Sequence, residues 1–203
     1  MWISWKHRKS DYPNPLTFEQ KVEVFYEQTL GWQIHIADLV ANGGTTFGES
    51  NPAQSGYEVR GIRHSGFAVL HMCLSYFELI GTLVTSKAAR LSDTAKFKAG
   101  VKAVLPNLFK GTSDDDALLR VLYKGGRCGL YHLGRPRAHV GLGQPPDSVP
   151  IAYDSNSGIV IISPERLPVA LKKHLEMFKA DLLNPANTAL RNEFAKSFDQ
   201  GFE

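Results

Sequence analysis

Cysteines and long apolar runs are both scarce in this chain, and each scarcity argues against a class of protein. The 203 residues include two cysteines, Cys73 and Cys128, whose spacing matches neither a zinc site nor a disulfide framework. The first residues lack the apolar core of a secretory signal, and no later run reaches the roughly 18 apolar residues of a membrane span. We therefore expect a soluble cytoplasmic protein with no membrane partner.

Internal repeats, linkers and low-complexity segments are also missing from the sequence. With 43% hydrophobic and 21% charged residues, the chain has the composition of an ordinary globular protein. Its length allows one sizeable core, so we expect a single domain over residues 1–203. The formal net charge of +3 is mildly basic, which permits an anionic partner without requiring one.

Apolar residues recur at helical spacing over most of the chain. Helices are predicted over residues 17–42, 62–88, 92–105, 114–122, 165–184 and 190–198. Residues 43–60, which are rich in Gly, Ser, Thr and Asn, predict a loop. Two apolar runs, 149–153 and 158–162, flank four turn-forming residues and predict a β-hairpin. The expected fold is mainly α, with a short β-hairpin inserted before the C-terminal helices.

The segment best suited to chemistry is residues 124–132, in which Arg127 and His132 follow a double glycine. The arginine fork grips phosphate oxygens, and histidine exchanges protons near neutral pH. Along a regular helix, five positions would leave the two side chains about 140° apart, with about 7.5 Å of rise between them. The pair can therefore meet at one phosphate if the helix breaks at Gly129, or if two copies of the motif face each other in a dimer.

The run from Arg127 to His132, Arg-Cys-Gly-Leu-Tyr-His, resembles the signature of the HEPN superfamily of helical nucleotide-binding and ribonuclease domains. It is similar in particular to a bacterial HEPN-like group with an Arg-Cys-Gly-Leu-x-His motif, and the resemblance extends over about residues 60–185. It implies a HEPN-like helical bundle and a homodimer with a shared cleft. Active members usually place Asn, Asp or His directly after the arginine, whereas this chain has Cys128.

The resemblance also implies a reaction and a set of roles. An RNA 2′-hydroxyl would attack the adjacent phosphorus without a metal or cofactor, and DNA would resist cleavage. His132 would act as general acid or base, and Arg127 would stabilise the phosphorane. The remaining roles fall to residues around the pair: Lys124, Arg135 and Arg137 would hold the RNA backbone, Tyr131 would stack on a base, and Glu78 would pair with Arg127 as an ion pair or as a contact that tunes the site.

Other interpretations of the same residues stay open. A non-catalytic HEPN-like module could recognise a nucleotide, an RNA or a second protein, with Arg127 in an ion pair and His132 at a helix end. Cys128 and His132, four positions apart, could form a thiolate and imidazole pair, but no third orienting group is evident. His64 and His71 could join His132 at a metal, but without an acidic ligand the sequence favours core or surface histidines.

Overall fold

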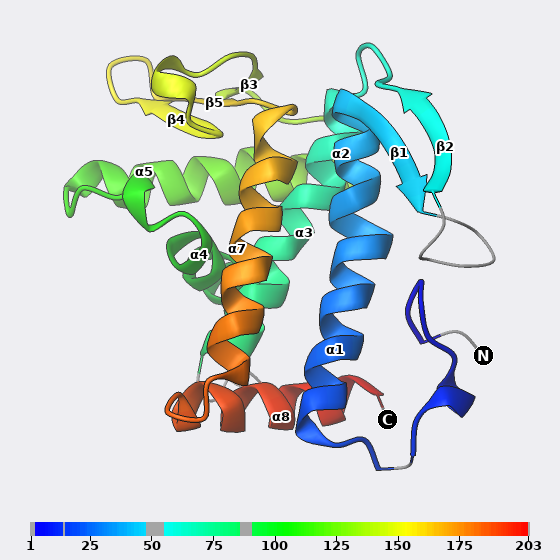
Figure 1. The fold of residues 1–203 in the computed structure, drawn as a ribbon. Coiled ribbons are helices and arrows are strands. Elements are labelled where there is room, and N and C mark those ends of the chain that lie inside the picture. Colours follow the sequence, from blue (N-terminus) through cyan, green and yellow to red (C-terminus); the bar gives the residue numbers. More distant parts are fainter. Residues whose placement is uncertain (1–2, 14, 48–54, 86–90, 203) are drawn as a thin grey trace.

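The structure is a computed structural model that describes residues 3–13, 15–47, 55–85 and 91–202 (Figure 1). It is mainly α-helical, as the sequence predicts. The helices are α1 (Phe18–Thr29), α2 (His35–Asn42), α3 (Gly66–Val84), α4 (Asp93–Val104), α5 (Ser113–Val121), α6 (Cys128–Leu133), α7 (Arg166–Leu183) and α8 (Thr188–Phe202). The strands are β1 (Gly43–Phe47), β2 (Ser55–Arg60), β3 (Val140–Leu142), β4 (Ile151–Asp154) and β5 (Ile159–Ile162).

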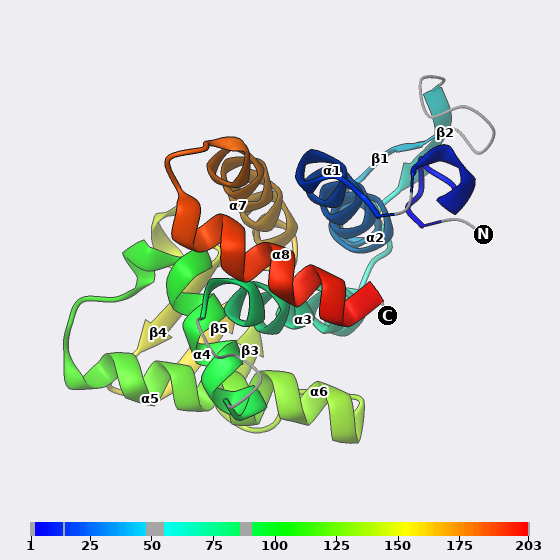
Figure 2. The ribbon, with the colours of Figure 1, turned by 90° about the horizontal axis from the view of Figure 1, so that it is seen from below.

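Helix α3 is the centre of the fold. Helices α2, α4, α6, α7 and α8 all contact it, and α8 crosses the ends of α1 and α7 (Figures 1 and 2). Within the described residues, α3 is the one helix long and apolar enough to span a membrane, with a mean hydropathy of 1.7, and half of that window is buried inside the fold. Such burial is typical of a core helix that is apolar on nearly every side.

The α3–α4 crossing is unusually close because two buried glycines meet there. A Cβ atom on Gly81 would collide with the carbonyl oxygen of Lys96, and one on Gly100 would collide with the carbonyl oxygen of Phe77. The missing side chains therefore allow the two backbones to touch.

Helices α1 and α2 form one helical run, joined by a π-helical stretch (Leu30–Ile34). Thr17 caps its start: its hydroxyl accepts a hydrogen bond from the Gln20 amide at 3.3 Å, and the Gln20 side chain accepts one from the Thr17 amide at 2.9 Å. Gly43, at φ 77°, ends the run in a conformation that other residues rarely adopt. Both boundaries agree with the sequence prediction.

The loop predicted for residues 43–60 is wrong where the structure describes it. Strands β1 and β2 pair antiparallel, with Gly44 opposite Val59, and a register shift falls between Thr45 and Phe47. Tyr57 and Val59 are the two apolar members of a short alternation on β2, and both are exposed, so the strand has no buried apolar face.

A second sheet lies between α6 and α7 in the sequence. Strands β4 and β5 pair antiparallel, with Asp154 opposite Ile159, and β4 ends one residue beyond the first apolar run. Strand β3, in a Gly- and Pro-rich segment for which no strand was expected, adds parallel to β5. The order is β3-β5-β4, and the sheet anchors the segment that returns from the motif helix.

Candidate functional site

The candidate motif lies on a helical rod made of α5, a π-helical stretch (Leu122–Arg127) and α6 (Figure 2). The rod stays helical from Arg127 through His132, so the break at Gly129 that the spacing allowed is not present. Gly134, in a left-handed conformation at φ 66°, ends it. The π-helical stretch begins just before the double glycine and shifts the register of every residue that follows.

Glycines in the motif are explained by close packing rather than by a helix break. A Cβ atom on Gly129 would lie 2.9 Å from both the carbonyl oxygen of Arg135 and the amide nitrogen of Arg137. One on Gly125 would lie 2.8 Å from a methyl carbon of Val140, and the Gly125 carbonyl accepts a hydrogen bond from the Arg137 amide at 2.9 Å. These contacts fold the chain after α6 back along the helix that carries the motif.

Arg127 forms an ion pair with Glu78 of α3. Its Nε and Nη2 atoms lie 3.2 and 3.1 Å from the same carboxylate oxygen, Oε2. The Arg127 side chain is 22% exposed and that of Glu78 is 26% exposed, so the pair is partly shielded from water. The ion pair offsets the free-energy cost of placing a carboxylate on a mostly apolar helix. Arg127 is also the partner that the sequence analysis proposed for Glu78.

Tyr131 connects Arg127 to two histidines. The Arg127 guanidinium carbon lies 4.7 Å from the centre of the Tyr131 ring. Tyr131 also contacts His71 of α3, whose ring is parallel to it with centres 6.3 Å apart, and His132, whose ring meets it edge-on at 5.2 Å. We call Glu78, Arg127, Tyr131, His71 and His132 the α3–α6 cluster. Tyr131 is 62% exposed, and both histidines are exposed, so the outer side of the cluster is open to a ligand.

Within one chain, Arg127 and His132 do not occupy one face. The helix places them on different sides, with Arg127 turned to Glu78 and His132 at the exposed end of α6. Tyr131, four residues after Arg127, lies on the same face of the helix as Arg127. His132 is one position further along and is therefore turned away from that face. Of the proposed catalytic pair, Arg127 is thus a partly buried cation and His132 an exposed imidazole.

The other predicted RNA contacts lie close to this cluster in the sequence and are all exposed: Lys124, Arg135 and Arg137. Arg135 and Arg137 belong to the returning segment that packs on Gly129. From Ala117 to Pro146 the sequence has five Lys and Arg residues and no Asp or Glu. This stretch therefore carries positive charge and no negative charge of its own, and in the contacts described two carboxylates meet it: Glu78, which pairs with Arg127, and Glu165, which bonds to Gln144.

Cys128 is half-buried, and its thiol interacts with the Tyr123 hydroxyl. That contact favours a structural thiol over the thiolate and imidazole pair with His132. In the part of the chain that the structure describes, no three His, Cys, Asp or Glu side chains gather into a possible metal site, and His64, His71 and His132 are not grouped.

His71 is the member of the cluster that sequence reasoning assigned to other roles. A signal for it was present, because Phe67, His71 and Glu78 follow one another at helical spacing along one side of α3. Phe67 is 45% exposed and His71 is exposed, which is unusual for a helix that is otherwise so apolar. That exposed edge marks the side of α3 on which the cluster forms.

No protein-family model matches this chain, and no curated protein or solved structure matches it either. Its function is therefore inferred from the arrangement of its own residues.

Proposed function

We propose that this protein is a HEPN-type endoribonuclease that cleaves RNA without a metal at a site shared between two chains. Arg127 stabilises the negative charge that develops on the phosphate, and His132 transfers the proton of the attacking 2′-hydroxyl or of the leaving oxygen. In this proposal the helices form a HEPN-like bundle, and the β4–β5 hairpin is its insertion.

The α3–α6 cluster is the arrangement that best supports this proposal. It combines an arginine, an exposed imidazole and an exposed aromatic ring, which are the groups needed to hold a phosphate, move a proton and stack a base. Lys124, Arg135 and Arg137 add exposed positive charge around it, as a strand of phosphates requires.

A homodimer completes the site in this proposal. Because one helix directs Arg127 and His132 to different sides, a twofold axis near α6 brings the arginine of one chain to the histidine of the other. Exposed Tyr131 and Leu133, at 62% and 56%, would become partly covered at such an interface. The dimer predicts a molecular mass near twice that of the 22.5 kDa chain in light scattering at micromolar concentration.

The Arg127–Glu78 ion pair favours a second candidate function, a module that binds RNA or nucleotide without cutting it. An arginine whose Nε and Nη2 atoms both face a carboxylate is partly neutralised before any phosphate arrives. In a binding module, that pair would mainly hold α6 against α3, and Tyr131 and the surrounding cations would form the contact surface.

Cleavage of labelled single-stranded and structured RNA in the presence of EDTA separates these functions. We expect the wild type to cut RNA, to leave 2′,3′-cyclic phosphate ends and to spare DNA. Arg127→Ala and His132→Ala should each reduce the rate by at least about 100-fold, because positioned acid–base and charge-stabilising groups contribute on that scale.

His139→Asn is the matched control, since it removes another exposed histidine and keeps a residue type that tolerates the positive φ of 72° at that position. It should cut RNA as fast as the wild type. RNA binding without cleavage by any of these proteins would instead establish the binding module.

A further inference from the structure

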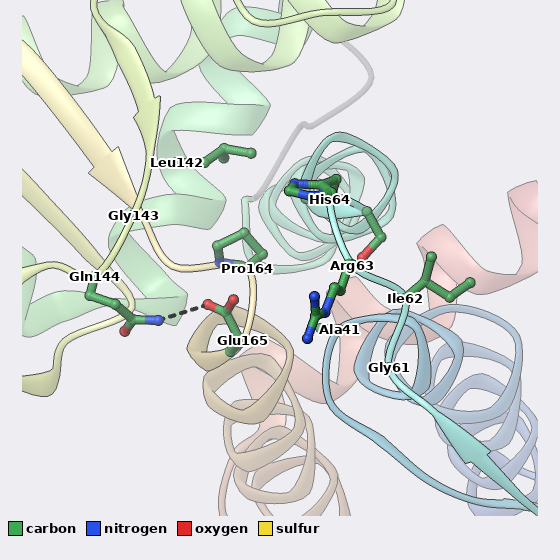
Figure 3. Close-up of a pocket in the computed structure, with 12 residues that line it drawn as sticks. Ala41, Gly61, Ile62, Arg63, His64, Leu142, Gly143, Gln144, Pro164 and Glu165 are labelled. Atoms are coloured by element: carbon green, nitrogen blue, oxygen red, sulfur yellow. Dashed lines mark hydrogen bonds between the residues drawn. The ribbon is translucent and has the colours of Figure 1, made fainter.

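A cavity of about 460 Å³ lies beside the N-terminal end of α3, outside the α3–α6 cluster (Figure 3). It is formed where four parts of the chain meet: the end of α2, the segment before α3, the end of β3 and the turn between β5 and α7. A Cβ atom on Gly66 would lie 3.1 Å from the Pro164 ring and would also collide with Leu142, so the glycine allows these parts to close around the cavity. Its volume lies within the range of small-ligand pockets.

The two sides of this cavity carry side chains of opposite charge. Figure 3 shows Arg63 and His64 on the side of α3, facing Gln144, Pro164 and Glu165. Arg63 and His64 are exposed, and among the described residues no carboxylate lies within ion-pair distance of Arg63. That side of the cavity therefore holds a cation available to a phosphate.

Glu165 forms the acceptor side. Its Oε2 atom accepts hydrogen bonds from the Gln144 amide at 3.1 Å and from the Ser163 hydroxyl at 3.0 Å, and its Oε1 atom takes part in neither. The carboxylate repels a phosphate but accepts hydrogen bonds from the N–H groups of a base or the hydroxyls of a ribose. A nucleotide would thus enter in one orientation, with its phosphate toward Arg63 and its base or ribose toward Glu165.

The cavity and the cluster both border α3. Phe67 follows Gly66 directly, is 45% exposed, and shares a face of α3 with His71, which stacks on Tyr131. Gly66 and His71 are five positions apart, which is about 7.5 Å along a helix. Two nucleotides of a stacked strand cover about that distance, since each rises about 3.4 Å.

We propose that this cavity binds one nucleotide of the RNA strand whose neighbouring nucleotides lie over Phe67, His71 and Tyr131. The inference rests on the proposed RNA function and extends it from the cleavage site to a separate binding subsite. Arg63 holds the phosphate of the bound nucleotide, and Glu165 with Gln144 receives its base or ribose.

The salt dependence of RNA binding tests this subsite. Binding of a fluorescein-labelled 12-nucleotide single-stranded RNA is measured by anisotropy over roughly 50 to 200 mM KCl. All proteins carry His132→Ala so that the probe stays intact. Arg63→Gln should reduce the steepness of the fall of log affinity with log salt by about 0.7, the value of one lost phosphate contact on a single strand, and weaken binding about fivefold near 0.1 M salt.

Lys196→Gln is the control, because it removes one exposed positive charge on α8, at the opposite end of the molecule from the cavity (Figure 1). It should leave both the slope and the affinity unchanged. If Arg63→Gln behaves as Lys196→Gln does while the parent protein binds RNA, the subsite is refuted and the proposed function stands. If the parent protein binds no RNA, the proposed function fails and the subsite fails with it.

Discussion

At the scale of the residue, Arg127 is defined by two neighbours that use different properties of its side chain. The guanidinium donates to Glu78 through two nitrogens, and its carbon lies over the Tyr131 ring. A lysine has neither the planar face nor the fixed fork, so it cannot reproduce both contacts. The same side chain therefore links α3 to α6 and orients the ring proposed to stack on RNA.

His174 of α7 is a second residue whose setting has a measurable consequence. Its Nδ1 atom lies 2.8 Å from the hydroxyl of Tyr76, a fully buried residue of α3. Burial lowers the pKa of His174 to about 4, against a small opposing effect of Asp181. Burial also raises the pKa of Tyr76, so the phenol stays protonated.

This lowered pKa predicts acid sensitivity of the fold. Because the folded pKa lies below the ordinary value of 6.5, the unfolded chain binds more protons between these values, and the free energy of unfolding falls as pH drops from 6.5 toward 4. We expect His174 to account for about 2 kcal/mol of that fall, since solvent screens the partly exposed ring. Urea unfolding at pH 7 and about pH 4.5 measures it.

His174→Gln provides the comparison, because glutamine retains a hydrogen-bonding group beside Tyr76 but does not titrate. The variant should lose less stability than the wild type between the two pH values. An equal loss in both proteins would show that other groups cause the acid sensitivity.

At the scale of the element, the α5–α6 rod depends on glycines that pack against the returning chain. Helix propensity alone predicts that Gly→Ala within a helix stabilises by about 1 kcal/mol. Gly129→Ala should do the opposite and lower the free energy of unfolding by about 2 kcal/mol, because its methyl group would meet the backbone of Arg135 and Arg137 at 2.9 Å.

Gly126→Ala is the matched change within the same rod. Its methyl group would meet only side-chain carbons, with Leu74 at 3.2 Å and Leu122 at 3.8 Å, and these can shift. Its stability should stay within about 1 kcal/mol of the wild type. Urea denaturation that finds Gly129→Ala as stable as Gly126→Ala would contradict the packing role of Gly129.

The elements that the sequence predicted are those with a buried stripe or a recognisable cap. Thr17 and Ser92 both accept hydrogen bonds at the helix starts predicted for them, and α7 carries its apolar stripe into the core. Strand β3 and the β1–β2 pair were missed because backbone pairing, rather than apolar alternation, defines them. The Gly81–Gly100 crossing was missed because glycine leaves no pattern to show which helix it faces.

Some contacts of the candidate site could be predicted from the sequence, and others could not. A carboxylate on an apolar helix needs a partner, and the resemblance to HEPN proteins suggested Arg127, which the structure places beside Glu78. The stacking of His71 on Tyr131 depends on how α6 lies against α3, which sequence spacing does not give. The continuous helix through Gly129 was likewise hidden, because the contact that fixes it comes from residues after the motif.

At the scale of the whole molecule, the central claim is that two chains share one site. One chain presents Arg127 and His132 on different sides of a continuous helix, and in the proposed function the arginine of one chain therefore acts with the histidine of its partner. A shared site also explains how Arg127 can stay paired with Glu78 in its own chain while its outer face meets a substrate held by the other.

Mixing two inactive variants tests this claim most directly. Arg127→Ala and His132→Ala proteins are combined in equal amounts, allowed to exchange subunits, and assayed for RNA cleavage in EDTA. Half of the resulting dimers contain both variants, and each of these has one site with Arg127 and His132 intact, so the mixture should recover about a quarter of the wild-type activity. A mixture as inactive as either variant alone, under conditions where the wild type cuts RNA, would contradict the shared site.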